Sequence, residues 1–108
     1  MELILESQAK ILREQHDQYS ASELSDLIVP VKLFGPHTNW KWYLLTQDPN
    51  DPDYLWAIVD GFAVEMGSVS LAELQEQQIA GIPAIERDIH CEPVNAKELW
   101  DGLINKGE

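Results

Sequence analysis

Near both ends of the chain, apolar residues recur every three or four positions, which is the spacing of an amphipathic helix. This pattern predicts one helix over residues 2–18 and another over residues 95–106, with Asn95 as the N-cap of the second. His16 lies on the apolar stripe of the first helix. A histidine in such a stripe is more often a partly buried structural residue than a ligand, so we expect a structural role for it.

The middle of the chain changes to short runs rich in β-branched and aromatic residues, separated by turn signals. Two capping-box sequences, Ser20 with Glu23 and Ser70 with Glu73, predict short helices, the second ending near Gln78. We therefore predict an α+β fold, a single domain with a mainly antiparallel sheet of about five strands and helices at the N-terminus, before the last strand and at the C-terminus. The strands are expected at residues 31–34, 40–47, 54–59, 63–69 and 85–91, with a bulge or a close backbone approach at Gly67.

The composition fits one folded domain. The chain has 108 residues, of which 44% are hydrophobic, and this is enough to form a hydrophobic core without stabilising disulfides or metal ions. The single cysteine, Cys91, excludes an internal disulfide and favours a reducing compartment. No apolar run approaches the length of a membrane span, and the N-terminus lacks the layout of a signal peptide. We expect a cytoplasmic protein with no membrane contact and no cofactor.

Charge is the strongest global signal. The chain carries 19 acidic and 7 basic residues, for a net charge of −12, and it has no basic residue between Lys41 and Arg87. This balance argues against direct binding of nucleic acid through its phosphates. It favours a basic protein partner, a cation or mimicry of a polyanion, or it serves only to keep a small protein soluble. The acids between the two basic residues are Asp48, Asp51, Asp53, Asp60, Glu65, Glu73, Glu76 and Glu86.

Residues 85–91 concentrate more reactive side chains than any other stretch. If they form a strand, Glu86, Asp88 and His90 lie in one row, at about 7 Å from one to the next. Two of them could bind one divalent metal or act as acid and base, but no nucleophile, phosphate loop or cofactor motif completes a catalytic site. We therefore expect no tight metal site, and we keep this row as a candidate polar binding site.

The opposite row of the same stretch is apolar except for Arg87. It contains Ile85, Ile89 and Cys91, so Cys91 is expected to be inert core rather than a reactive thiol. An inward-facing arginine requires a partner, because an unpaired buried charge is very costly. We expect Arg87 to form a structural ion pair with Asp60 or Glu65, with a role in ligand binding as the alternative.

Residues 48–53 have the composition of a calcium loop but not its pattern. A calcium loop needs oxygen ligands at alternate positions and a glycine for its tight turn, whereas Pro52 occupies one of these positions and no glycine follows. A solvated turn is the better interpretation. We expect its acids, together with Glu76, to belong to a partner-binding surface. The candidate binding residues are Asp48, Asp51, Asp53, Glu76, Glu86, Asp88 and His90.

Several of these motifs together resemble a family of small bacterial proteins catalogued only as a domain of unknown function. The resemblance covers residues 31–92 and implies a family core there, with a helical N-terminal extension at 1–29 and a C-terminal helix at 95–106. Met66 stands where leucine is expected, and Cys91 where an aromatic residue is common. The family implies carriage on plasmids, phages and other mobile elements, and it brings no activity with it. The motifs are residues 31–34, Trp42, Thr46, 48–49, Asp60, 65–67, 70–74 and the Glu-Arg-Asp-x-His sequence of 86–90.

Three functions stay open on these observations. The favoured one is a small acidic protein-binding module of mobile-element origin, in its most specific form an inhibitor of a host defence nuclease by polyanion mimicry. The second is a small hydrolase or metal-dependent enzyme that uses Glu86, Asp88 and His90. The third is a structural or accessory subunit that dimerises through exposed aromatic residues. Mimicry needs exposed acids, whereas an enzyme needs a concave pocket that contains the His90 row.

Overall fold

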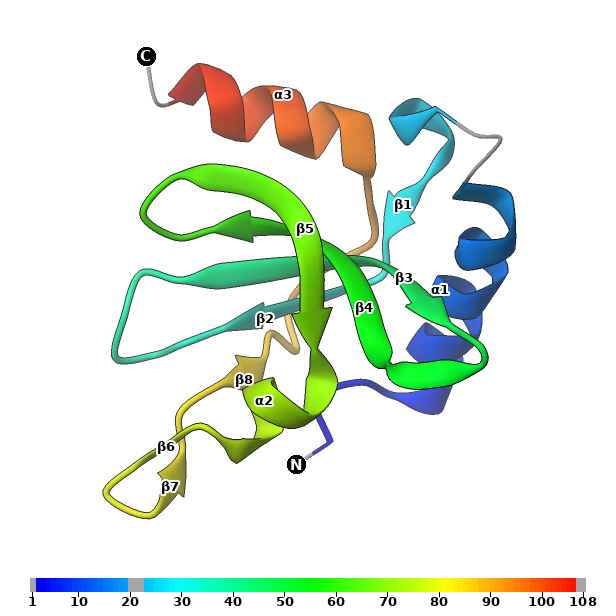
Figure 1. The fold of residues 1–108 in the computed structure, drawn as a ribbon. Helices are drawn as coiled ribbons and strands as arrows, with labels where there is room; N and C mark the ends of the chain where they lie inside the picture. Colours follow the sequence, from blue (N-terminus) through cyan, green and yellow to red (C-terminus); the bar gives the residue numbers. More distant parts are fainter. Residues whose placement is uncertain (1, 20–22, 107–108) are drawn as a thin grey trace.

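The computed structural model describes residues 2–19 and 23–106 of the chain. Its strands form a curved sheet between helices of very different length (Figure 1). The elements follow in the order α1 (Glu6–Tyr19), the 3-10 turn η1 (Leu24–Asp26), β1 (Ile28–Val29), β2 (Val31–Phe34), β3 (Lys41–Asp48), β4 (Asp51–Asp60), β5 (Val64–Ser70), α2 (Leu71–Glu76), β6 (Gln78–Ile79), β7 (Ile82–Pro83), β8 (Glu86–Arg87), β9 (Val94–Asn95) and α3 (Ala96–Lys106).

The central sheet has five strands in the order β5-β4-β3-β2-β8, and all neighbours run antiparallel. Strands β2 to β5 follow one another along the chain through short turns, as expected for consecutive hairpins. Two further pairs lie outside this sheet: β1 with β9, and β6 with β7. The predicted α+β fold with a five-stranded antiparallel sheet is therefore confirmed.

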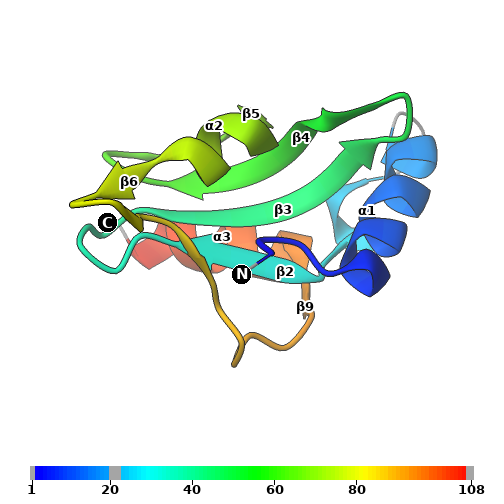
Figure 2. The ribbon, with the colours of Figure 1, turned by 90° about the horizontal axis from the view of Figure 1, so that it is seen from below.

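The sheet is covered on both faces. Successive side chains of a strand point to opposite sides, so Trp42 and Leu44 pack with Leu74 of α2, while Tyr43 and Leu45 pack with Ala96 of α3. Figure 2 shows α2 on one side of the sheet and α3 on the other, with α1 beside the end of the sheet where β3 turns into β4. We call these two sides the α2 side and the α3 side. Strand β3 is buried on both, as its aromatic and apolar sequence predicts.

One buried glutamine fixes α1 against the sheet. Gln15 is only 7% exposed. Its Nε2 donates hydrogen bonds to the carbonyl oxygens of Ile28 (2.9 Å) and Leu45 (2.7 Å), and its Oε1 accepts one from the backbone N–H of Ile28 (2.8 Å). His16, the residue that the apolar stripe singled out, is partly buried at the adjacent position. The inward side of α1 is therefore formed by Ala9, Leu12 and this polar clamp.

The bulge and the close backbone approach expected at Gly67 are both wrong. Gly67 pairs in regular register with Ala57, and space around it is open. Two irregularities lie instead in β3, one between Gln47 and Asp48 and the other between Leu44 and Thr46, where Leu45 has no partner in β4. The extra residue of a bulge is left without its ladder partner, and here the carbonyl oxygen of Leu45 accepts the hydrogen bond of Gln15.

Two expected segments, the helix after Ser20 and the turn at 48–53, are shorter than the sequence indicated. Ser20 lies outside the described residues, and the helix expected after it is only the single turn η1, which Glu23 caps with Asp26. Ile28 and Val29 then form β1 instead of continuing a helix, because β-branched residues before a proline favour an extended backbone. The turn expected at 48–53 is also tighter, since Asp48 already pairs with Asp51 at the start of β4.

The strand expected at residues 85–91 extends only over Glu86–Arg87. Asp88 ends it, because its Oδ1 accepts a hydrogen bond from the backbone N–H of His90 (2.9 Å) and turns the chain. As a result Ile89, which was expected to face the core, is 68% exposed. Ile85 alone of the predicted inward row is fully packed, at 4% exposed.

Candidate functional site

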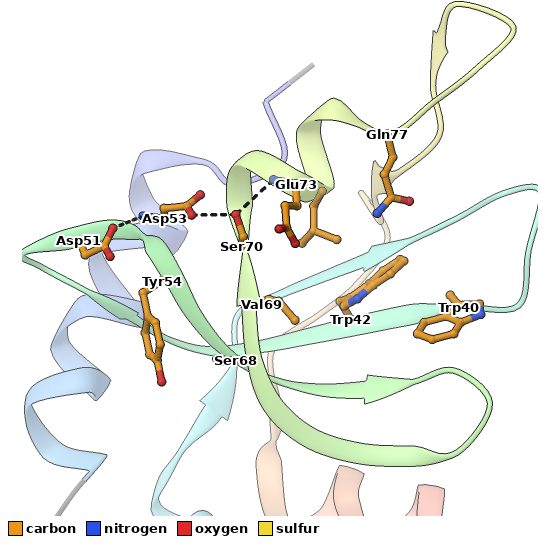
Figure 3. Close-up of a pocket in the computed structure, with 11 residues that line it drawn as sticks. Trp40, Trp42, Asp51, Asp53, Tyr54, Ser68, Val69, Ser70, Glu73 and Gln77 are labelled. Atoms are coloured by element: carbon orange, nitrogen blue, oxygen red, sulfur yellow. Dashed lines mark hydrogen bonds between the residues drawn. The ribbon is translucent and has the colours of Figure 1, made fainter.

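A hollow of about 480 Å³ opens on the α2 side of the sheet. Its roof is one flank of α2, its floor is β3 and β5, and the start of β4 closes one end (Figure 3). Three aromatic and three acidic side chains lie in its wall, and no lysine, arginine or histidine does. The lining residues are Trp40, Trp42, Asp51, Asp53, Tyr54, Ser68, Val69, Ser70, Glu73, Leu74 and Gln77.

The aromatic wall continues out of the hollow onto the surface. The rings of Trp40 and Trp42 lie 6.0 Å apart between centroids, with 30° between their planes. Phe62, in the turn between β4 and β5, meets Trp40 edge to face at 5.2 Å and is 97% exposed. Gly61 makes this approach possible, because a Cβ at that position would lie 2.5 Å from the Trp40 ring. A ladder of three aromatic rings thus leads from solvent to the pocket.

The acids of the pocket are held in different ways. Asp53 accepts hydrogen bonds from the Ser70 hydroxyl (2.7 Å) and from the backbone N–H of Ala72 (2.7 Å), so it ties β4 to the first turn of α2. Ser70 in turn accepts a hydrogen bond from the backbone N–H of Glu73 (3.2 Å), which confirms Ser70 as the predicted N-cap. The backbone bond from Ala72, followed by the Ser70 bond, lowers the pKa of Asp53 below its ordinary value.

The Asp53 bonds predict a pH-dependent contribution to stability. A carboxylate with a lowered folded-state pKa stabilises the fold fully above its unfolded pKa, and this contribution is lost as the pH falls through the folded pKa. We therefore expect Asp53→Asn to lower the melting temperature at neutral pH. The difference in melting temperature between the variant and the wild type should become smaller as the pH falls below about 4. Thermal unfolding followed by circular dichroism from neutral to acid pH measures this. Asp51→Asn is the control, and a gap equal at all pH values would contradict the assignment.

Other predicted surface acids also have local bonds. Asp48 accepts a hydrogen bond from the backbone N–H of Asn50 (2.8 Å) and so stabilises the β3–β4 turn. Asp51 accepts one from the backbone N–H of Asp53 (3.3 Å). Glu76, the last residue of α2, is exposed and makes no hydrogen bond or ion pair with any residue that the structure describes. Asp48 and Asp53 therefore have structural roles in addition to their charge, which sequence reasoning did not distinguish.

Basic residues lie almost entirely away from the pocket. Lys32 and Lys41 alternate with the residues that face α2, so the strand register places them on the α3 side. Lys10 and Arg13 belong to α1, and Lys97 and Lys106 belong to α3. Arg87 alone shares the α2 side, at the outermost strand of the sheet, where it pairs with Leu33. The two sides of this acidic protein thus differ strongly in charge.

Glu86, Asp88 and His90 do not form one site. Glu86 is exposed beside a different hollow that Leu3 and Ile85 also line, and His90 is exposed. Asp88 Oδ2 lies 3.4 Å from Lys32 Nζ. The backbone N–H of His90 is the main cause of the lowered pKa of Asp88, and Lys32 contributes further. Within the described ranges no three histidine, cysteine or acidic side chains are arranged to hold a metal ion.

The expected ion pair of Arg87 is wrong. Asp60 and Glu65 lie on β4 and β5, which β2 and β3 separate from β8, so neither carboxylate can reach the guanidinium. Arg87 Nη1 donates instead to the carbonyl oxygen of Glu2, and it forms no ion pair with any described acid. A backbone carbonyl from the N-terminal segment thus takes the place of the predicted carboxylate.

Cys91 is half-buried behind the same turn. Burial, with a smaller contribution from Asp88, raises the pKa of its thiol, so the reactive thiolate is disfavoured. Burial likewise raises the pKa of Tyr43, reinforced by Asp60, Cys91 and Asp88. Lys32 Nζ lies 5.7 Å from the centroid of the Tyr43 ring. These groups form a small polar cluster around the Lys32–Asp88 pair rather than an activated nucleophile.

The geometry defines a small α+β domain with one acidic, aromatic-lined hollow under its short middle helix. The chain matches the family described as "Protein of unknown function (DUF2958)" over residues 3–101, and it belongs to that family. This match includes α1 and the first turns of α3, so it reaches beyond residues 31–92. No curated protein and no solved structure matched the chain. No helix in residues 2–19 or 23–106 is long and apolar enough to cross a membrane.

Proposed function

We propose that the protein is a small acidic protein-binding module whose α2 side receives a basic region of a protein partner. The observation that carries this proposal is the separation of charge between the two sides of the sheet. Asp51, Asp53, Glu65, Glu73 and Glu76 are exposed around β4, β5 and α2, whereas six of the seven basic residues lie on α1, on α3 or on the α3 side of the sheet.

Such a surface selects its partners by charge. Complementary electrostatic potentials speed the association of two proteins and disfavour partners of like charge. Both effects weaken as salt screens the charges. Nucleic acid, which is a polyanion, is repelled by this side of the molecule. The exposed Phe62 and the partly exposed Trp40 add apolar contact area of the kind that is enriched at binding surfaces. The proposed partner surface is therefore basic and carries apolar groups beside its charges.

In its most specific form, the proposal is that the protein comes from a mobile genetic element and inhibits a host defence nuclease. The nucleic-acid site of a nuclease is basic because it neutralises phosphates. A protein that presents carboxylates over the same area competes with the nucleic acid without being a substrate. The net charge of −12 and the five exposed acids around β4, β5 and α2 support this form of the proposal.

The test begins with affinity capture from the native host and continues with titration of the purified partner. We expect the dissociation constant to rise as the salt concentration increases from about 0.05 M to about 0.3 M, because screening shortens the reach of the charges. We expect no binding of DNA or RNA oligonucleotides by the protein itself, and we expect an oligonucleotide that binds the partner to compete with it. Tight oligonucleotide binding, or a partner whose affinity is independent of the salt concentration, would contradict the proposal.

A further inference from the structure

We infer that the hollow beneath α2 binds the cationic side chain of a single arginine from the partner. This inference rests on the proposed function, and it names the residue type that the site selects. An arginine combines a planar guanidinium, which stacks on aromatic rings and pairs with carboxylates, with an apolar stem. Each of these three properties, stacking, charge pairing and an apolar stem, has a counterpart in the wall of the hollow.

The floor of the hollow is suited to stacking against a planar cation. Trp40 and Trp42 are inclined by only 30° with their centroids 6.0 Å apart, and the partly exposed Trp40 offers most of this aromatic surface because Trp42 is 8% exposed. A guanidinium over the face of a tryptophan within about 6 Å gains a cation–π attraction, and tryptophan is the best of the aromatic residues for it. Leu74 and Val69 supply apolar surface for the stem.

The walls supply negative charge that the protein does not neutralise. Asp53 is held ionised by its bonds to α2, so a fixed charge stands at one end of the hollow. Glu73 lies in the roof, and its carboxylate makes no hydrogen bond or ion pair within the described part of the chain. Figure 3 shows this carboxylate pointing from α2 toward the sheet, and the amide of Gln77, the residue after α2, pointing the same way. A bound cation would meet both an aromatic face and a free carboxylate.

The size and charge of the hollow favour this ligand over a neutral one. A volume of about 480 Å³ is in the usual range for ligand pockets, about 300–1,000 Å³, and holds a guanidinium with its stem. A sugar could also stack on the two tryptophans. It would, however, bring no charge to a wall with three carboxylates and no basic residue. A cation offsets this like-charge repulsion, which a neutral ligand leaves in place.

The test uses defined peptides. One heptapeptide carries a single central arginine among glycine, serine and alanine, and a second carries citrulline, the neutral analogue of arginine, at the same position. We expect the arginine peptide to shift the indole N–H resonances of Trp40 and Trp42 in ¹H–¹⁵N spectra, and to leave those of Trp56 and Trp100 unchanged. The citrulline peptide should bind at least about fivefold more weakly, because the carboxylates no longer contribute.

A matched pair of variants separates the site from the general charge. Glu73 and Glu98 are both exposed and both occupy the third position of a helix, after the caps Ser70 and Asn95. Glu73→Gln should lower the affinity for the arginine peptide by at least about threefold, and Glu98→Gln should leave this affinity unchanged. Equal effects of the two exchanges would overturn the inference.

The remaining outcomes distinguish this inference from the proposed function. If the captured partner binds with salt dependence but the arginine peptide leaves Trp40 and Trp42 unshifted, the inference fails and the proposed function stands. If the citrulline peptide or a neutral oligosaccharide shifts these two resonances as strongly as the arginine peptide does, the site does not select a cation and the inference is overturned. If the arginine peptide binds but no basic partner does, the broader function fails instead.

Discussion

Replacement of Gln15 by methionine should lower the free energy of unfolding by about 3 kcal/mol. Methionine has a similar length and a good helix propensity, so we expect the exchange to retain both the packing volume and the intrinsic stability of α1. The hydrogen bonds to the backbone of Ile28 and to the carbonyl oxygen of Leu45 are lost together. The Leu45 bond is buried, and a buried polar group without a partner costs about 1–3 kcal/mol.

The control for this exchange is Gln18→Met, at an exposed position of the same helix. It changes the same atoms without removing a buried hydrogen bond, so its effect should stay within about 0.5 kcal/mol. Urea denaturation of the three proteins measures both values. Equal stability of Gln15→Met and the wild type would show that α1 is held by its apolar residues alone.

Gln15 also marks the limit of what the sequence can predict. The apolar stripe of α1 identified the helix and its buried residues Ala9 and Leu12, because burial of such residues repeats with the helical period. It also drew attention to His16, while the buried polar residue is Gln15. Its role depends on the bulge at Leu45, thirty positions away in the chain, and no local pattern contains that information.

The sheet was predictable because its strands are organised locally. Strands β2 to β5 are consecutive, each has a recognisable apolar or aromatic run, and the turns between them contain glycine, proline or aspartate. Residues 85–91 were misread because Ile89 continues the alternation of a strand, although Asp88 has already turned the chain. A short polar residue that bonds to a backbone N–H two positions later outweighed the apolar pattern.

The candidate site was predictable only in part. The excess of acids in the middle of the chain was visible from composition, and Asp51, Asp53 and Glu73 do lie around one hollow. The hollow itself depends on how α2 sits over β3, which the bonds of Asp53 to Ser70 and Ala72 determine. The strand predicted at 40–47 contains Trp42, yet the position of this residue at the floor of a pocket requires the tertiary structure.

The second large effect is expected on binding. Changing Glu65, Glu73 and Glu76 together to glutamine should lower the affinity for the protein partner by about tenfold to a hundredfold. Three exposed charges on the contact surface are each expected to contribute about 0.5–1 kcal/mol to the binding free energy. All three are exposed, and none is an acceptor in the bonds that tie α2 or the β3–β4 turn. Asp48 and Asp53 are left unchanged because they do accept such bonds, so the variant should keep its fold.

The most direct measurement compares this variant with one of equal charge. Changing Glu14, Glu92 and Glu98 to glutamine also removes three exposed acids, but from α1, α3 and the loop before β9, none of which lines the pocket. Isothermal titration of the partner into the wild type and both variants gives three dissociation constants at one salt concentration. We expect a large loss of affinity for the α2-side variant and nearly unchanged affinity for the other. Equal losses of affinity in the two variants would mean that net charge, and not the α2 side, governs binding, and would contradict the proposed role of the α2 side.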